Sequence, residues 1–220
     1  APLPNTESSS ASPWRVSARK SDHPMASSPQ QSSPTWAKVV STVFHPFLMP
    51  LFTLVLLYLS DPILHLHFAA FIYLLVVLAV NTVAPAISLY VMYKRGAISD
   101  LEIRNRSQRS WPFLVVLAYY TLTWFIAGSG DNARMIPGVY MGLLTGLIAA
   151  IAGAILITRW FKLSMHGMGV GGTLGALVAV QPLHFSPSLT LDLMLVLIAG
   201  AVGWSRLALG VHTHREVYAG

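Results

Sequence analysis

The feature that most constrains this chain is a series of six apolar stretches. They occupy residues 37–59, 68–93, 111–128, 136–159, 167–183 and 188–205. About 20 predominantly apolar residues in a helix cross the hydrocarbon core of a bilayer. The pattern therefore predicts an all-α membrane protein, built as a bundle of about six transmembrane helices. The composition agrees, because 54% of the 220 residues are hydrophobic and only 10% are charged.

The first 36 residues have a different composition from the rest of the chain. They are rich in serine and proline and show almost no apolar periodicity. Such a segment cannot bury enough surface to fold alone. We therefore expect residues 1–36 to form a polar tail, either disordered or bound along partner subunits, and residues 37–220 to form the helical transmembrane domain.

The basic residues are distributed unevenly between the connections. If the six helices alternate in direction, every one of the 14 lysine and arginine residues except Arg134 lies at the same face. The positive-inside rule then predicts an integral protein of a cell's inner membrane with a cytoplasmic N-terminus. We interpret the net charge of +6 as a consequence of topology and expect no nucleic-acid partner.

Glycine and proline residues occur at specific positions within several of the apolar stretches. Glycines at every fourth position predict close helix packing, as in the runs Gly138, Gly142, Gly146 and Gly171, Gly175. Three prolines are expected to kink the first two helices, with Asn81 satisfying the backbone groups that are freed near the last of them: Pro46, Pro50 and Pro85.

The first of three polar clusters contains Arg104, Arg106 and Arg109, just before the third apolar stretch. Arginine presents a planar fork of donors that suits phosphate oxygens. Taken alone, however, a basic loop beside a membrane helix is most simply a determinant of topology.

The second cluster contains Ser164 and His166, at the start of a glycine-rich stretch. A helix N-terminus and a serine hydroxyl both offer donors to a phosphoryl oxygen. An imidazole there could protonate a leaving alcohol. The competing interpretation is that both residues only cap a helix at the membrane boundary.

The third cluster lies in the segment SRLALGVHTHRE, which places Arg206, His212 and Glu216 behind the last apolar stretch. Glu216 follows His212 by four residues, so in a helix its carboxylate can hold one imidazole nitrogen and leave the other nucleophilic. Arg206 would neutralise a phosphoryl group. Two apolar stretches separate each cluster from the next, so all three are expected at one face of the membrane.

This last segment resembles the third signature of the type 2 phosphatidic acid phosphatase superfamily, which includes lipid phosphatases and vanadium haloperoxidases. That signature reads Ser-Arg, five residues, His, three residues, Asp, and here Glu216 replaces the Asp. The run LSMH, residues 163–166, keeps the Ser and His of the second signature, Pro-Ser-Gly-His. The first signature is matched only by an arginine-rich segment that ends in Trp111 and Pro112. The chain is thus similar to a divergent member.

The resemblance implies hydrolysis of a lipid phosphate or isoprenoid diphosphate through a phosphohistidine intermediate, without metal or other cofactor. His212 would be the nucleophile, Glu216 its orienting partner and His166 the general acid. The phosphoryl oxygens would be held by four further residues: Ser164, Arg206, Arg106 and Arg109. Membrane lipids are the implied partners.

Two alternatives remain open. In the family another spanning helix follows the third signature, whereas this sequence stops at Gly220, so we expect a final helix to be missing and His212 and Glu216 to lie on a frayed end. The first alternative is a non-catalytic accessory subunit of a larger membrane complex, with the tail bound along partner subunits. It would explain the expected absence of the final helix. Four further histidines also suggest a pigment- or haem-binding protein: His45, His65, His67 and His184.

Overall fold

The computed structural model describes residues 33–101, 103, 105–184 and 188–220, with the side chains of Arg106, Leu183 and His184 left out. The serine- and proline-rich tail therefore lies outside the described residues, apart from 33–36. The helices are α1 (Thr35–Val43), α2 (Met49–Ser60), α3 (Pro62–His65), α4 (Phe68–Lys94), η1 (Arg106–Gln108), α5 (Ser110–Ala127), α6 (Asn132–Met135), α7 (Gly138–Thr158), α8 (Met165–His184), α9 (Leu189–Ala208) and α10 (His214–Ala219).

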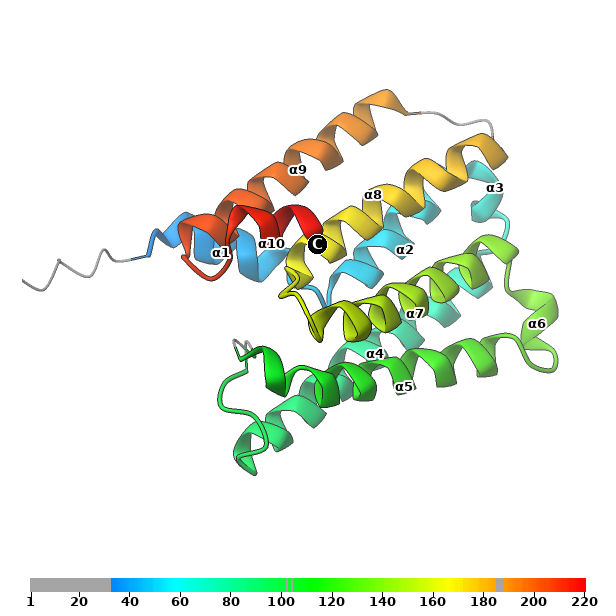
Figure 1. Ribbon diagram of the computed structural model, residues 1–220. Coiled ribbons are helices and arrows are strands. Elements are labelled where there is room, and N and C mark those ends of the chain that lie inside the picture. Colours follow the sequence, from blue (N-terminus) through cyan, green and yellow to red (C-terminus); the bar gives the residue numbers. More distant parts are fainter. Residues whose placement is uncertain (1–32, 102, 104, 185–187) are drawn as a thin grey trace, which may run out of the picture. The chain divides into compact units, whose positions relative to one another are not determined.

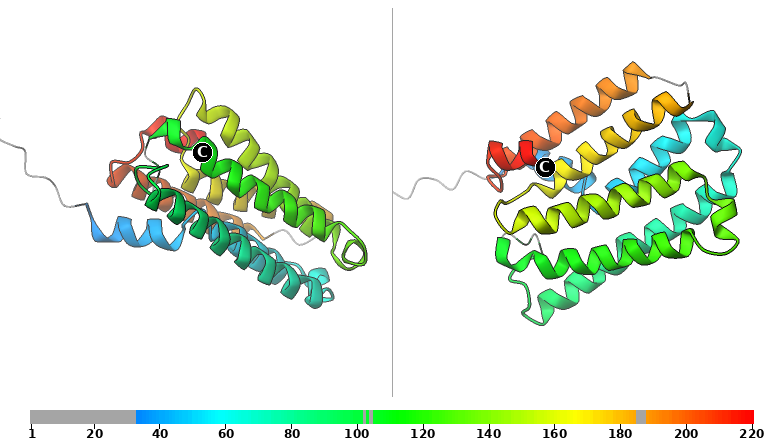
Figure 2. Two further views of the ribbon diagram at one scale, coloured as in Figure 1. Left: turned by 90° about the horizontal axis from the view of Figure 1, so that it is seen from below. Right: turned by 45° about the vertical axis from the view of Figure 1, so that its right-hand side comes forward.

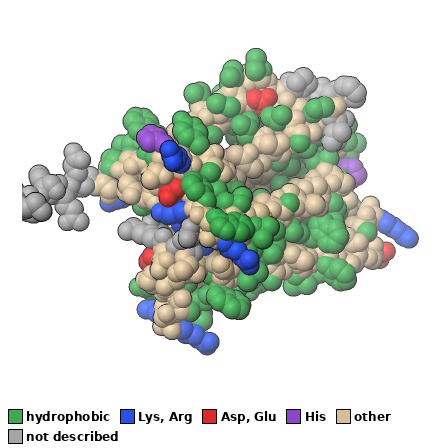
Figure 3. All heavy atoms as spheres, viewed as in Figure 1, with side chains coloured by type: hydrophobic (Ala, Val, Ile, Leu, Met, Phe, Trp, Pro, Cys, Tyr) green, Lys and Arg blue, Asp and Glu red, His purple; other side chains and the backbone are tan. Residues whose placement is uncertain are grey.

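Among the described residues, four helices are long and apolar enough to cross a membrane, namely α4, α5, α7 and α9. This confirms the prediction of a helical membrane protein, whereas six spans stay a prediction. The outer face of α4 shows why it suits lipid, because Val76, Val80, Val83 and Ile87 lie about one turn apart and are each more than half exposed. Figure 3 shows hydrophobic side chains covering much of the visible face.

The first apolar stretch does not form one long helix. It breaks over residues 44–48, because the proline at position 46 has no backbone N–H to continue α1. Pro50 stands in the first turn of α2, where a missing N–H costs nothing. The expectation that Pro46 and Pro50 kink a helix was therefore wrong, since they separate two helices.

Within α4, Pro85 lies inside the helix as expected. Asn81 does not serve the backbone freed by that proline, because its side-chain amide donates to the Thr123 hydroxyl on α5. This contact instead ties α4 to α5 within the apolar interior.

The helices pack side by side in an order that differs from the chain order. α5 contacts α4 and α7, α7 contacts α8, and α8 contacts α2 and α9 (Figures 1 and 2). α1 packs along α9, with the Trp36 and Trp204 ring centroids 4.9 Å apart. The start of α8, the end of α9 and all of α10 consequently lie together (Figure 1).

Close helix packing uses other glycines than the two predicted runs. A Cβ added to Gly142, Gly146 or Gly175 would meet nothing within 4 Å. At Gly169 it would lie 2.8 Å from Met49, and at Gly203 it would lie 3.0 Å from Val217. These two positions allow α2 and α10 to come into close contact. Among the predicted glycines only Gly171 would meet a neighbour, the Gly220 carbonyl at 3.8 Å, so the prediction of close packing does not hold for the other four.

The segment that follows α9 is tied to the rest of the fold. Thr213 and Glu216 form a capping box at the start of α10, and the backbone N–H of Ser164 donates to the Glu216 carbonyl over 3.0 Å. A frayed position for His212 and Glu216 was therefore the wrong expectation.

Candidate functional site

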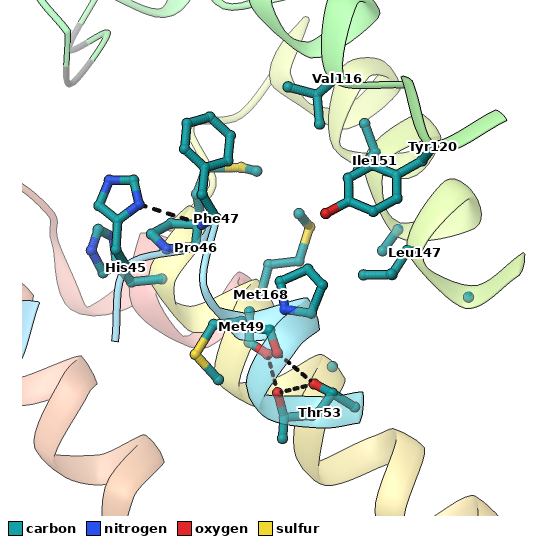
Figure 4. A pocket seen from close by; sticks show the side chains of 18 of the residues that line it. His45, Pro46, Phe47, Met49, Thr53, Val116, Tyr120, Leu147, Ile151 and Met168 are labelled. Carbon is teal, nitrogen blue, oxygen red and sulfur yellow. Dashed lines mark hydrogen bonds between the residues drawn. The ribbon is translucent and has the colours of Figure 1, made fainter. Parts of the chain in front are cut away.

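A cavity of about 830 Å³ lies between α2, α5, α7 and α8. Its lining is polar at one end, where residues from α1, α8, α9 and the loops beside them meet: Ser41, His45, Arg109, His166, Arg206 and His212. The remaining lining is mostly apolar, including Val116, Leu147 and Ile151 (Figure 4). The structure thus joins a charged end to a long apolar body within one space.

At the charged end, Ser41 of α1 connects two predicted site residues. Arg206, near the end of α9, donates from Nη1 to the Ser41 hydroxyl. His166 donates from Nε2 to the Ser41 carbonyl over 3.0 Å and lies 3.2 Å from its hydroxyl. All three residues are buried. One serine therefore fixes both a cation and an imidazole.

The state of His166 follows from these contacts. A carbonyl oxygen can only accept, so Nε2 carries the proton that it donates to Ser41. Burial, followed by the charge of Arg206, lowers the pKa of His166 to about 3. Without a ligand the ring is neutral, with its Nδ1 lone pair uncommitted among the described residues.

The next contact joins His212, in the loop after α9, to Glu216 on α10. His212 Nδ1 lies 2.9 Å from Glu216 Oε2, and only 5% of the histidine side chain is exposed. The same carboxylate oxygen accepts from the Thr213 N–H, and Lys162 Nζ lies 3.7 Å away. This is the geometry that orients an imidazole, since a carboxylate on Nδ1 leaves Nε2 unprotonated.

The titration of this pair follows from its surroundings. Burial lowers the pKa of His212 below its ordinary value, with the nearby Lys162 acting in the same direction, although the bond to Glu216 opposes both. Burial tends to raise the pKa of Glu216, but hydrogen bonds from His212 and Thr213 outweigh it and the net shift is downward. At neutral pH the pair is therefore a neutral imidazole beside a carboxylate.

Arg109, the residue before α5, supplies a second buried cation. Its Nε donates to the Ile103 carbonyl over 2.9 Å and its Nη1 to the Leu163 carbonyl over 3.0 Å. These bonds hold the guanidinium between the loop before α5 and the loop before α8. Arg109 therefore lines the cavity in a fixed orientation.

Two further predicted site residues are Ser164 and Arg106, and only the first has a described side chain. Ser164 is fully buried outside the cavity lining, where its hydroxyl accepts from the Gly167 N–H over 3.3 Å and caps α8. The capping interpretation therefore describes its contact in this structure, and its role in phosphoryl binding stays a prediction. Arg106 begins η1, but its side chain lies outside the described residues.

Three residues that the sequence analysis did not assign to a phosphate site belong to this cluster. They are Ser41, His45 and Lys162. Lys162 donates to the Val211 carbonyl over 2.8 Å and so anchors the loop that carries His212. Nothing in the sequence marks Ser41, because a serine in a short amphipathic helix is common. The proline break after His45 was the available signal for that residue.

Within the described part of the chain, no three His, Asp or Glu side chains meet in a way that could hold a metal ion. His45 lies beside His166, with ring centroids 5.7 Å apart, whereas His65 packs on Tyr58 past the middle of α2. The histidines proposed as porphyrin ligands are therefore spread over both ends of α2, and the His184 side chain lies outside the described residues.

The long apolar helices and the cavity between them define a helical membrane protein. In comparisons with known proteins, no family model, curated protein or solved structure matches the chain.

Proposed function

We propose that this protein binds a phosphate-bearing membrane lipid at the charged end of the cavity and hydrolyses it through a phosphohistidine on His212. The observation that supports this most is the single cavity that combines buried Arg109 and Arg206 with His166 and His212, and continues as an apolar space. An anionic headgroup on a hydrocarbon chain matches both parts of that lining.

In the first step, the Nε2 lone pair of His212 attacks phosphorus. The new P–N bond forms as the bond to the lipid oxygen breaks, and that oxygen keeps the electron pair. Arg109 and Arg206 stabilise the charge on the phosphoryl oxygens. Glu216 stabilises the positive ring through the proton on Nδ1.

The leaving oxygen also needs a proton. His166 is neutral before binding, so it must gain that proton when the phosphate arrives. A phosphate monoester has its second pKa near 6, so its monoanion can supply the proton, and the anion beside His166 then favours the charged ring. In the second step water attacks phosphorus, its proton passes to His166, and the electron pair of the P–N bond returns to His212.

The decisive experiment uses the full chain in detergent with phosphatidate as substrate, and measures release of inorganic phosphate. His212→Asn should lower the rate by at least about 10³-fold, because the nucleophile is lost. His214→Asn is the matched control, since His214 is exposed two residues away and does not line the cavity. Equal phosphate release by wild type and His212→Asn would overturn the mechanism.

A second candidate is a protein that binds the same lipid phosphate without turnover, as part of a membrane assembly. Two observations favour this candidate. His166 is neutral and donates to the Ser41 carbonyl, and Ser164 caps α8 outside the cavity lining. It predicts saturable binding of phosphatidate by wild type, loss of that binding in Arg206→Ala, and no phosphate release. Absence of binding to both phosphatidate and an isoprenoid diphosphate would refute both candidates.

A further inference from the structure

The apolar body of the cavity has one wall that carries a row of small residues. On α7 they recur at every fourth position, and α8 contributes more of them from the facing side: Gly138, Gly142, Gly146 and Ala150, with Gly172 and Ala176. Larger residues complete the lining. Some lie between the small ones on α7, such as Leu143 and Leu147, and others come from α2 and α5, such as Leu57 and Val116.

The glycines on this wall provide space. A Cβ added to Gly142, Gly146 or Gly172 would meet nothing within 4 Å, although each residue lines the cavity. Gly169 behaves differently, because a Cβ there would collide with Met49. The α7 glycines are therefore not required for helix contact, and their small size sets the width of the cavity.

The wall is long enough for a lipid tail. From Ile151 to Gly138 it follows about 20 Å of α7, at a rise of about 1.5 Å per residue. One leaflet of a bilayer core is about 15 Å deep, half of the roughly 30 Å total. α7 ends at Thr158, shortly before Lys162 and His166, so the wall leads away from the charged end.

One polar group from α5 also faces this space. Tyr120 of α5 is only 3% exposed, yet its hydroxyl has no hydrogen-bond partner among the described residues. Figure 4 shows this hydroxyl directed into the cavity, on the same side as Leu147 and Ile151. A hydrocarbon chain in this space would leave the hydroxyl without a hydrogen bond, whereas a water could satisfy it in the absence of a lipid.

We propose that this wall binds one long hydrocarbon chain of the phosphate lipid, and that Gly142 and Gly146 set how far the chain reaches. This inference rests on the proposed function, because the charged end fixes the position of the headgroup. The substrate class is thereby narrowed to lipid phosphates with chains of ordinary membrane length.

The test measures equilibrium binding of oleoyl and octanoyl lysophosphatidate to the full chain and to Gly146→Leu. Wild type should prefer the oleoyl lipid. Gly146→Leu should weaken oleoyl binding by about tenfold or more and change octanoyl binding less than about twofold, because the leucine blocks only the distal chain. Leucine also favours helix more than glycine does, so Tm should not fall.

Gly153→Leu is the matched control, since Gly153 lies on α7, has open space around its Cβ and does not line the cavity. It should bind both lipids as wild type does. If Gly146→Leu weakens both lipids equally or neither, the tail inference is overturned while headgroup binding stands. If wild type binds neither lipid, the proposed function and the tail inference both fail.

Discussion

The two ends of the cavity are built in opposite ways. At the charged end, each ionisable group that faces the space is held by at least one partner, as Arg109 is by Ile103 and Leu163 and as His212 is by Glu216. In the apolar body, the Tyr120 hydroxyl has no partner among the described residues, and the α7 glycines border open space.

This difference corresponds to two kinds of ligand recognition, one by fixed hydrogen-bond donors and one by the shape of an apolar space. A phosphoryl group has one size and one geometry, so fixed donors recognise it best. A hydrocarbon chain offers only surface area, so the space left by small side chains decides which chains fit. Changes at the charged end should therefore alter turnover for every lipid, whereas changes in the body should alter the choice among lipids.

The largest effect is expected from Arg206→Ala. Arg206 is buried at the charged end, so its loss should lower kcat/KM for phosphatidate by about 10³-fold, whatever the chain length. Phosphate-release kinetics with short- and long-chain substrates provide the measurement. Arg215→Ala, at an exposed arginine on α10, should stay within about twofold of wild type. A loss confined to long chains would contradict the division between the two ends.

A smaller effect is expected from Glu216→Gln, at about 10- to 100-fold in kcat. The bond and charge of Glu216 raise the pKa of His212, so their loss lowers that pKa further. Because the neutral ring is the nucleophile, the acidic limb of the rate profile should move to lower pH. A pH profile of kcat/KM checks the direction. A shift of the acidic limb to higher pH would show that this limb does not report the titration of His212.

Ser41→Ala should reduce kcat/KM by roughly tenfold. It removes the hydroxyl that accepts from Arg206 but leaves the carbonyl that accepts from His166. Removing the partner of a buried charged donor costs about 1–3 kcal/mol. Ser88→Ala on α4 is the control, because its hydroxyl bonds only outside the site. Full activity in Ser41→Ala would show that α1 does not position Arg206.

The smallest effect should come from Tyr120→Phe, which removes an unpartnered hydroxyl from an apolar space. Affinity for oleoyl lysophosphatidate should rise by about twofold, because the phenyl ring has no polar atom to desolvate. Binding isotherms at fixed pH measure it, with inorganic phosphate binding unchanged as the control. A loss of affinity would mean that the hydroxyl contacts a polar atom of the lipid.

The sequence predicted some features well because they depend on topology. The helical membrane class followed from the lengths of the apolar stretches. The expectation that Arg109, His166 and Arg206 would face one side needed only that helices alternate in direction. The contact between His212 and Glu216 was predicted from a spacing of one helical turn. The contact is present, but His212 lies in the loop just before the N-cap Thr213, so the start of α10 and not a shared helical turn brings the two side chains together.

Other features could not be predicted because they depend on packing between distant segments. The role of Ser41 was missed, and that of Ser164 was left open between two interpretations, for one reason. A serine can cap a helix, bridge two side chains or face a ligand, and only its neighbours decide. The glycines were ambiguous in the same way. A four-residue spacing fits both close contact, as at Gly169, and open space, as at Gly146.

The contact between Ser41 and its two partners makes the site depend on a helix of only nine residues. α1 is separated from α2 by the break at residues 44–48, so its position is set by its packing along α9 and not by a continuous helix with α2. A slide of one turn, about 5.4 Å, would exceed any hydrogen-bond distance and free Arg206 and His166 from Ser41 at once. The arrangement of Arg206 and His166 at the charged end therefore depends on the position of α1.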